Sequence, residues 1–436
     1  MDPFTIGIIG ILAVVVLILL GLHVAVVLGV VGMLGLMFLI GPKAAIYTSA
    51  TLSFDRVSNY SLVIIPLYVL MGVLAQESGL SANAYESLRL WTGRFPGGLG
   101  IATVGACTMF GTMCGSSLVT AAVFAQLSAP EMRRMGYDKK FAYGVCSSGG
   151  VIGMLIPPSV LIVVYGILTQ DSIGQLLIGG ISPGLMLFVI FSLGIVMMVL
   201  LKPSLAKRME HKPKWKERFV SLKNLWGVVL TVAIIFVGIF SGVFSPSEAG
   251  AVAVVVLLVI YAFRPKKDWG GLTSAFYGTV STSSMIFLIL IGAGIFSRFL
   301  VLSTVAPRFL EAFIKWNLSP IIFLVMVSVG YIILGCFFDS ISMLSITLPL
   351  LHPAALKLGI NPLHFAMVAI VAIEVGLITP PVGLNVYAVK GVAESDVTLE
   401  DLFAGVWPFF LMMVLCLILF ILFPVLSTFL PGLMVE

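Results

Sequence analysis

Charged side chains are scarce in this sequence, and their scarcity excludes most classes of soluble protein. Only 10% of the 436 residues are Asp, Glu, Lys or Arg, whereas 60% are hydrophobic. No segment has the mixed polarity that a soluble domain needs on its surface. Together with a mean hydropathy of +1.17, the apolar runs along the whole chain indicate a polytopic helical membrane protein.

Cysteine and histidine are also few, and neither is spaced to bind a metal or to form a disulfide framework. The four histidines are scattered, and the five cysteines lie in apolar surroundings that favour a packing role: Cys107, Cys114, Cys146, Cys336 and Cys416. The apolar segments carry no phosphate loop, nucleophile elbow or His–Glu metal motif. The sequence therefore predicts neither an enzyme nor a bound organic cofactor.

The net charge of +5 lies mainly in short loops, so we interpret it as an orientation signal rather than a nucleic-acid surface. Residues 202–224 form a basic connector with eight basic residues against Glu210 and Glu217: Lys202, Lys207, Arg208, Lys212, Lys214, Lys216, Arg218 and Lys223. The positive-inside rule places this connector in the cytoplasm. The basic loops at residues 133–140 and 264–267 fall on the same side, and counting spans backwards places Met1 outside the cytoplasm.

One pattern of helix-breaking residues occurs twice, in the same order. Gly111-Thr-Met-Cys-Gly-Ser-Ser117 precedes a run that ends Gly-Met-Leu-Ile-Pro-Pro158, and Gly335-Cys-Phe-Phe-Asp-Ser340 precedes Glu374-Val-Gly-Leu-Ile-Thr-Pro-Pro-Val-Gly-Leu-Asn385. Gly335 follows Gly111 by 224 residues (335 − 111), and Pro380 follows Pro157 by 223 (380 − 157). Gly and Pro inside apolar segments free backbone groups that lipid cannot satisfy, so an ion or a substrate is a candidate partner.

This duplication predicts two inverted copies, at residues 1–201 and 225–436. Each copy has a re-entrant hairpin, at about 98–129 and 319–351, and an interrupted helix, at about 141–168 and 362–389. The other expected spans are 4–20, 23–40, 61–76, 175–201, 225–242, 247–263, 274–302 and 402–426. Five crossings per half is an odd number, so the second half is inserted upside down and its hairpin opens outward. The expected fold is an all-α polytopic membrane protein with an inverted-topology repeat, the pattern of a secondary transporter.

The breaks supply the candidate site residues. Backbone carbonyls and hydroxyls are hard oxygen donors that suit Na⁺, and we expect two or more ions. The candidate Na⁺ ligands are Gly111, Ser116, Gly149, Gly153 and Pro157 in the first copy and Gly335, Ser340, Gly376 and Thr379 in the second. The candidate substrate ligands are Ser116, Ser117, Pro158, Asp339, Ser340, Pro381 and Asn385. A kinked helix satisfied by neighbouring side chains is the alternative for each break.

Ionisable residues within the apolar segments have competing interpretations. Asp339 and Glu374 are functional candidates because of their depth, but Asp339 could cap the second half-helix and Glu374 could be a hydrogen-bonded strut or gating residue. Glu248 fits a capping box with Ser245 better than a gating role. Arg298 and Arg308 lie near the outward hairpin, where a solvated interface is the favoured interpretation.

These motifs resemble a known family. Asp339-Ser-Ile-Ser, the run Glu374 to Asn385, Gly115-Ser-Ser117 with Ile156-Pro-Pro-Ser159, and Ser247-Glu-Ala-Gly250 are similar to the large, DctM-like membrane subunit of tripartite ATP-independent periplasmic (TRAP) transporters. The resemblance covers essentially the whole chain, and the Thr379-to-Asn385 run is its most specific part. Cys336 and the two phenylalanines that follow it depart from the small or Met residues expected at that tip.

The resemblance implies a bacterial inner-membrane protein that imports an organic acid, such as a C4-dicarboxylate or sialic acid, with Na⁺ by an elevator mechanism. It also implies two partners, a small four-helix membrane subunit and a soluble periplasmic binding protein. No small subunit is expected in this chain, because nothing precedes Phe4. The alternatives are a single-component carboxylate carrier that needs no binding protein and, from another class, a membrane-embedded transferase or protease that uses Asp339 and Glu374.

Overall fold

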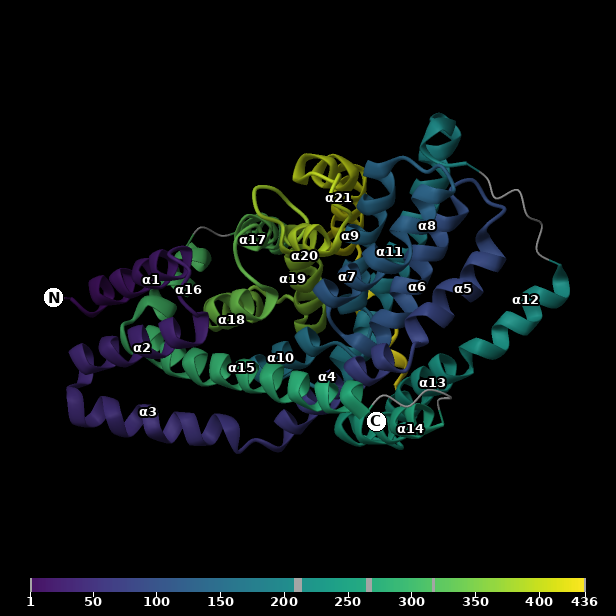
Figure 1. Cartoon of the computed structure of the whole chain (residues 1–436). Helices are drawn as coiled ribbons and strands as arrows, with labels where there is room; N and C mark the ends of the chain where they lie inside the picture. Colours follow the sequence, from purple (N-terminus) through teal and green to yellow (C-terminus); the bar gives the residue numbers. More distant parts are fainter. Residues whose placement is uncertain (1, 208–213, 264–268, 316–317, 435–436) are drawn as a thin grey trace.

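The computed structural model describes residues 2–207, 214–263, 269–315 and 318–434, and within these ranges the chain is helical without a β-strand. The predicted all-α class is confirmed. Figure 1 shows the helices coloured along the chain. Several residues of the basic loops, among them Arg208, Lys212 and residues 264–267, lie outside the described residues, as does Met1.

The first three helices form an arm beside one long helix. α1 (Pro3–Leu19), α2 (Val24–Ile40) and α3 (Pro42–Val57) lie at one end of the molecule, and α15 (Trp269–Leu302) extends from them towards the centre (Figure 1). A small separate core joins α1 and α2 to the C-terminal half of α15. Gly32 permits this packing, because a Cβ there would lie 2.8 Å from the amide nitrogen of Phe296.

Five stretches of the described chain are long and apolar enough to cross a membrane alone. They are Tyr60–Glu77, α11 (Ile173–Leu201), Trp215–Phe240, Gly270–Leu302 within α15, and α21 (Leu399–Leu422). The first of these stretches consists of η1 (Tyr60–Val63) and α4 (Ile64–Glu77). The third consists of α12 (Trp215–Leu222), η3 (Lys223–Leu225) and α13 (Trp226–Phe240). A multi-pass membrane protein is thereby supported. α1, α2 and α14 (Pro246–Ala262) have 17 residues each, slightly short of the roughly 20 that a bilayer requires, and the predicted total of ten crossings stays a prediction.

The first hairpin and the first interrupted helix occur where the glycines and prolines predict them. α6 (Gly98–Cys114) and α7 (Ser117–Leu127) meet at Gly115 and Ser116. α9 (Lys139–Leu155) and α10 (Val160–Thr169) are bent by 42° and together are long enough to cross. The expected second break, at Gly149 and Gly150, is wrong, since α9 runs through it. There the tertiary packing outweighs the low helix propensity of glycine, because a Cβ at Gly150 would overlap Ala121 of α7.

The second copy has the same plan. α17 (Pro320–Gly335) and α18 (Ser340–Lys357) form its hairpin, and α19 (Pro362–Gly376) and α20 (Leu384–Val392) form its interrupted helix. The limits proposed for the two repeats themselves, residues 1–201 and 225–436, stay a prediction.

Several shorter helices were not expected. These are α3, α5 (Leu80–Thr92), α8 (Ala129–Arg134), α12, α16 (Val305–Lys315), α22 (Val425–Thr428), η2 (Pro203–Leu205) and η4 (Pro431–Leu433). α12 also shows that the 202–224 connector is partly helical rather than a loop. A search for uniformly apolar runs passes over such segments, because polar residues alternate with apolar ones along most of them.

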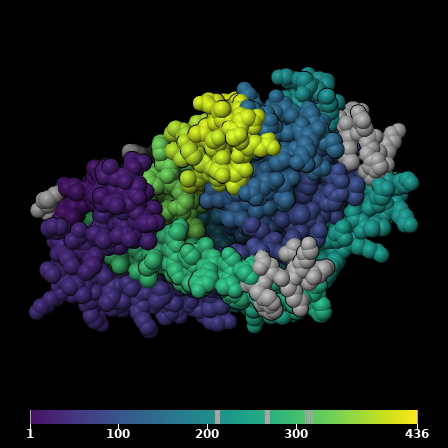
Figure 2. Space-filling view, viewed as in Figure 1, coloured from purple at the N-terminus to yellow at the C-terminus, as the bar shows by residue number. Residues whose placement is uncertain are grey.

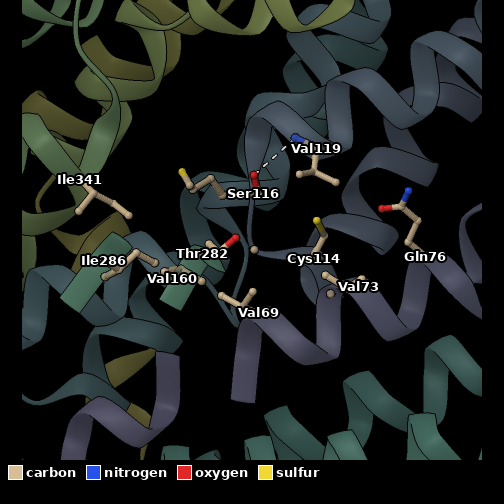
Figure 3. Close-up of a pocket in the computed structure, with 13 residues that line it drawn as sticks. Val69, Val73, Gln76, Cys114, Ser116, Val119, Val160, Thr282, Ile286 and Ile341 are labelled. Carbon is tan, nitrogen blue, oxygen red and sulfur yellow. Dashed lines mark hydrogen bonds between the residues drawn. The ribbon is translucent and has the colours of Figure 1, made fainter. Parts of the chain in front are cut away.

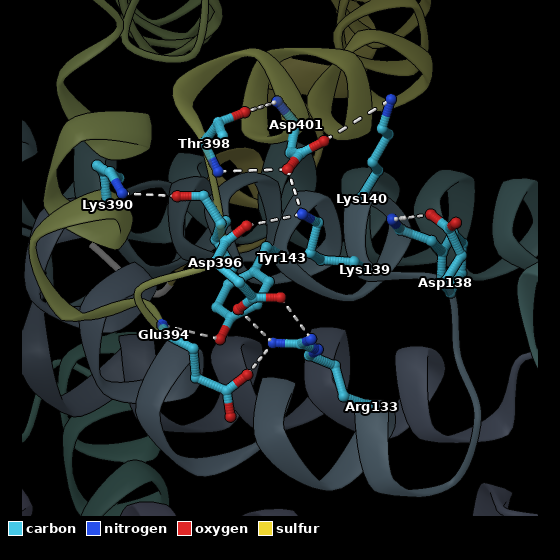
Figure 4. Close-up of polar contacts among 12 residues, drawn as sticks. Arg133, Asp138, Lys139, Lys140, Tyr143, Lys390, Glu394, Asp396, Thr398 and Asp401 are labelled. Atoms are coloured by element: carbon cyan, nitrogen blue, oxygen red, sulfur yellow. Dashed lines mark hydrogen bonds and ion pairs between the residues drawn. The ribbon is translucent and has the colours of Figure 1, made fainter.

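Charged loops of the two copies meet at one end of the hairpins (Figure 4). Arg133, just after the first hairpin, donates two hydrogen bonds to the Asp396 carboxylate at 2.8 and 2.9 Å and also pairs with Glu394. Lys139, at the start of α9, lies 2.5 Å from Asp401 and donates to the Asp396 carbonyl at 2.8 Å. The open end of the first hairpin therefore lies on the same side as the chain that follows α20.

A second contact joins the copies at the opposite end. Asp171 follows α10, and its carboxylate lies 3.8 Å from Nε2 of His352, which stands 12 residues beyond the tip of the second hairpin. Nδ1 of the same imidazole lies 3.3 Å from the Tyr165 hydroxyl of α10. Because α9 and α10 run from the first contact to the second and together are long enough to cross a membrane, the two hairpins open towards opposite ends of the protein, as an inverted repeat requires.

The helices of the two halves pack into one body outside the arm. Figure 2 shows the C-terminal segment against the first-half helices, with the N-terminal helices at the far end. One large core contains side chains from both hairpins and both interrupted helices.

Candidate functional site

The tip of the first hairpin is a tight turn between two helix ends. Gly115 has φ of +58°, a left-handed conformation that glycine adopts without strain, and its amide donates to the Gly111 carbonyl at 2.9 Å. Ser116 then caps α7, because its hydroxyl accepts from the Val119 amide at 3.4 Å. The positive end of α7 therefore points into the middle of the protein.

The tip of the second hairpin uses a carboxylate in the same place. Asp339 is the N-cap of α18, and it accepts a hydrogen bond from the Ser342 amide at 3.1 Å and another from the Ser342 hydroxyl. The capping interpretation of Asp339 is thus what the geometry shows, and its half-buried carboxylate still stands at the tip. Ser117 and Ser340 occupy equivalent positions, the first residue of the second half-helix in each copy.

Matching glycine pairs bring each hairpin against its own interrupted helix. A Cβ at Gly111 would overlap the Cα of Gly153, and a Cβ at Gly335 would lie 2.7 Å from the Cα of Gly376. The four residues belong to the predicted Na⁺ ligands. The structure therefore packs the two glycines of each copy against each other, and their role as Na⁺ ligands stays a prediction.

The two breaks differ in exposure. Ile156 to Ser159 are buried, whereas Thr379 is half-buried and Pro380 and Pro381 are exposed. The Pro157–Pro158 and Pro380–Pro381 peptide bonds are both cis.

The backbone oxygens at the breaks are satisfied to different degrees. The Gly153 carbonyl has no helical donor, because residue 157 is proline and lacks an N–H. In the second copy, the Gly376 carbonyl accepts from the Thr379 amide at 3.0 Å, and the Thr379 hydroxyl donates to the Val375 carbonyl at 2.7 Å. Gly149 lies inside the continuous α9 and so has no broken backbone; its role as a Na⁺ ligand stays a prediction.

Glu374 lies between the two tips. It is fully buried, and its Oε1 accepts from the Ser340 hydroxyl at 3.3 Å. The Ser117 hydroxyl of the other tip is also an interacting neighbour of this carboxyl, although its own hydrogen bond goes to the sulfur of Met154 at 3.9 Å. Oε2 of Glu374 has no hydrogen-bond partner.

Asn385, in the first turn of α20, is another buried polar side chain without a hydrogen-bond partner. It is fully buried, and neither its Oδ1 nor its Nδ2 has a partner. Its backbone amide donates to the Leu377 carbonyl across the break at 3.1 Å. A buried amide without partners destabilises the folded protein, so Asn385 stays a candidate substrate ligand.

A cavity of about 200 Å³ opens beside the first tip. Figure 3 shows Cys114 and Ser116 of the tip between Val69 and Val73 of α4 on one side and Thr282 and Ile286 of α15 on the other. Ile341, next to the second tip, and Val160, next to the first break, complete it. The cavity therefore touches both hairpins and two helices outside them.

Ser116 is the one predicted site residue that lines this cavity. The sequence analysis did not identify its other polar residues, Gln76 and Thr282. Single polar residues in apolar spans were the only signal that could have indicated them. Ser117, Pro158, Asp339, Ser340, Pro381 and Asn385 do not line it.

The remaining candidates have local roles. Glu248 forms the expected capping box, since its Oε2 accepts from the Ser245 amide at 2.8 Å and the Ser245 hydroxyl accepts from the Glu248 amide at 3.3 Å. Arg298 is exposed on α15. Arg308 is also exposed, with its guanidinium 4.6 Å above the Phe4 ring and 3.7 Å from the Asp2 carboxylate.

Comparison with solved structures supports the fold. The chain is similar to the Alcanivorax borkumensis YdaH transporter, whose crystal structure was described as having an unusual topology, with a TM-score of 0.59 over 99% of this chain and 98% of that one. The sequence identity is only 15%, so this similarity concerns the fold alone.

Sequence comparison is more specific. The C4-dicarboxylate TRAP transporter large permease protein DctM of Vibrio cholerae is 32% identical over 403 residues, covering 86% of each chain. The sialic acid TRAP transporter large permease protein SiaM of the same organism is 31% identical over 381 residues, covering 86% of this chain and 87% of that one. The isethionate TRAP transporter permease protein DctMQ of Oleidesulfovibrio alaskensis is 30% identical over 88% of this chain and 60% of that one.

The family model described as "Tripartite ATP-independent periplasmic transporter, DctM component" matches residues 11–426. Taken with the duplicated hairpins and breaks, this match shows that the chain belongs to the DctM family, the large permease components of TRAP transporters.

Proposed function

We propose that this chain imports an organic acid anion across the bacterial inner membrane in symport with Na⁺. The observation that carries the proposal is the convergence of two matched hairpin tips, from opposite faces, on the buried Glu374 and the breaks of the interrupted helices. A soluble periplasmic binding protein delivers the substrate, and a small four-helix membrane subunit completes the transporter. The N-terminus lies on the periplasmic side.

The tips suit an anionic substrate. The N-terminal ends of α7 and α18 point into the centre of the protein, and helix N-termini stabilise negative groups. Ser116 borders the cavity between the hairpins. Relatives named for C4-dicarboxylate, sialic acid and isethionate transport all act on compounds with an acidic group.

Sodium supplies the driving force. In this proposal, one Na⁺ binds main-chain oxygens behind each tip, close to where Gly111 meets Gly153 and where Gly335 meets Gly376. Two Na⁺ entering with a monovalent anion carry one net charge inward, which is worth ~2.3 kcal/mol across 100 mV. At about 1.4 kcal/mol per tenfold, the potential alone supports more than one decade of accumulation.

Movement follows an elevator mechanism. The hairpins and interrupted helices pack together in one core, and charged contacts at both faces join them. α15 and the arm helices α1 to α3 belong in part to another core, so they are the natural scaffold. The cavity lies at the boundary between these two groups.

The test is uptake by proteoliposomes that contain the full chain, its small subunit and its binding protein, offered radiolabelled succinate, sialic acid and isethionate separately. We expect one acid to accumulate only with an inward Na⁺ gradient, and more strongly with a negative interior potential. Uptake that is indifferent to external Na⁺ would contradict the coupling. Equal uptake without the binding protein would instead favour a single-component carrier.

A further inference from the structure

A cavity of about 470 Å³ lies away from the hairpin tips, where the end of α4 and the start of α5 meet the junction of η3 with α13 and the end of α14. Figure 1 shows α5, α13 and α14 far from the arm helices α1 to α3. The described residues that line this cavity belong neither to the tips and breaks nor to the cavity beside the first tip. The proposed transport of an organic acid therefore leaves it without a role.

Part of the lining is polar and carries a positive charge. It consists of Ser78, Asn83, Lys223 and Asn224. Within the described part of the chain, the exposed Lys223 forms no ion pair, and no acidic residue lines the cavity. Ser78 is buried, and its hydroxyl has no hydrogen-bond partner. An anionic group with several oxygens would compensate the ammonium charge and accept hydrogen bonds from these side chains.

The rest of the lining is apolar. Leu80, Val259, Ile260 and Phe263 supply aliphatic and aromatic surface, and Val259 and Phe263 are themselves exposed. Trp226, which is also exposed, is the first residue of α13. An indole at the end of an apolar helix is typical of the boundary between acyl chains and headgroups. The cavity therefore suits an amphipathic ligand better than a soluble anion.

Contacts between α5 and α12 hold the backbone that leads to Lys223. The Ser87 hydroxyl of α5 donates to the Ser221 carbonyl at 2.8 Å, and Nε1 of Trp91 donates to the Arg218 carbonyl at 3.3 Å. Both acceptors belong to α12, which η3 follows directly. The backbone that carries the ammonium group is therefore fixed against α5.

The surface of α12 indicates what kind of ligand is at hand. Trp215 and Phe219 are exposed, and so are Lys216 and the N-cap Lys214. Exposed aromatic and basic side chains together are typical of a helix at the surface of an anionic bilayer. The positive-inside rule predicts the cytoplasmic side for this connector, and basic pockets between transmembrane helices on that side bind anionic lipid headgroups.

We propose that this cavity binds an anionic phospholipid of the cytoplasmic leaflet. The phosphate lies at Lys223 and Ser78, and an acyl chain packs on Val259 and Phe263 of α14. One lipid then contacts the α4–α5 turn, the start of α13 and the end of α14, so its binding stabilises the packing of these helices. The site is independent of Na⁺ and of the transported acid.

The experiment is native mass spectrometry of the full chain in detergent, titrated with phosphatidylglycerol or with phosphatidylcholine of the same acyl chains. Both lipids carry a phosphate, and only the first has a net charge. We expect the wild type to prefer phosphatidylglycerol about fivefold, the factor that one basic residue near an anionic lipid supplies. Lys223→Gln should remove this preference. Ser78→Ala should weaken the binding of both lipids about threefold, because both lose the same hydrogen bond to phosphate.

Lys216→Gln is the matched control. It removes one positive charge from the same connector, but Lys216 is exposed and does not line the cavity. This variant should keep both the affinity and the preference of the wild type. Thermal unfolding gives a second measurement, in which phosphatidylglycerol should raise the unfolding temperature of Lys216→Gln more than that of Lys223→Gln, whereas inorganic phosphate should raise neither.

The outcomes separate a lipid site from its alternatives. A preference for phosphatidylglycerol that is lost in Lys223→Gln and kept in Lys216→Gln supports the site. Equal loss in both variants would show a general attraction to the basic connector, and equal binding of the two lipids by the wild type would show no selection for charge; either result overturns the proposal. Stabilisation by inorganic phosphate alone would assign the cavity to a soluble anion, and displacement of the lipid by the small membrane subunit would assign it to the interface with that subunit. Both of these results also overturn the lipid site.

Discussion

The contact between Gly335 and Gly376 gives the sharpest structural prediction. A Cβ at Gly335 would lie 2.7 Å from the Cα of Gly376, and a Cβ at Gly376 would lie equally close to the Cα of Gly335. Neither neighbour is a side chain that could rotate away. Gly335→Ala must therefore push α17 and α19 apart, and overpacking of this kind typically costs about 1–3 kcal/mol.

Gly330 provides a matched control on the same helix. A Cβ at Gly330 would meet no atom within 4 Å, so Gly330→Ala should gain up to about 1 kcal/mol from the higher helix propensity of alanine. The free energies of unfolding of the two variants, whose substitutions lie five residues apart in α17, should then differ by about 1–4 kcal/mol, with Gly330→Ala the more stable. Gly111→Ala should resemble Gly335→Ala, because it faces Gly153 in the same way.

The assay is thermal unfolding of the purified variants in one detergent, with ²²Na⁺ binding measured in parallel. We expect the order Gly330→Ala, wild type, Gly335→Ala from most to least stable, and weaker Na⁺ binding only in Gly335→Ala. If Gly335→Ala melts at or above the temperature of Gly330→Ala, the close backbone approach is not a feature of the folded protein.

Three further predictions follow from the tips and the charged loops. Asn385→Leu should raise the free energy of unfolding by about 1–3 kcal/mol, since two unsatisfied polar atoms leave the core. The same substitution should abolish substrate uptake. Unchanged uptake would show that Asn385 has a packing role only. Asp339→Ala should cost about 1 kcal/mol of stability through the lost cap while Asp339→Asn keeps most of it, so thermal unfolding separates the cap from any loss of uptake that both variants share. The Arg133 guanidinium lowers the pKa of Asp396 below its usual value, so this pair stabilises the fold above the unfolded-state pKa of Asp, roughly 3.9, and its contribution disappears as the pH falls through the lower folded-state pKa. The unfolding temperature of Arg133→Gln should therefore differ from that of the wild type at neutral pH and equal it in acid. A difference that persists in acid would contradict the assignment.

The hairpins and the interrupted helices could be predicted from the sequence because glycine and proline act locally. Gly115 and Pro157 end helices within apolar runs through their own backbone chemistry, whatever surrounds them. Gly149 and Gly150 have the same local propensity, yet α9 continues through them because α6 and α7 pack too closely for larger residues. A glycine can end a helix or can allow another helix to pack closely against it. Which of the two occurs depends on tertiary packing, and the sequence alone does not predict that packing.

Contacts between distant segments were beyond prediction for a different reason. Ser340 was a candidate, and so was Glu374, but nothing in their spacing placed the carboxyl of one beside the hydroxyl of the other. Asp171 and His352, 181 residues apart (352 − 171), gave no signal at all, since neither lies in the repeated motifs. The inverted repeat predicts that the two hairpin tips meet. Which side chains make the contacts between the copies depends instead on the depth and rotation of each helix.

Those joining contacts bear on how the proposed elevator could work. Each hairpin is held to the interrupted helix of the other copy at the face where it opens, by Arg133 with Asp396 at one face and by His352 with Asp171 at the other. A hairpin that moved alone would have to separate such a contact, so the four elements are expected to travel together. The wall that α15 contributes to the cavity instead includes the apolar Ile286. Apolar surfaces can slide past one another without breaking directional bonds, so the boundary at this cavity is where the movement should occur.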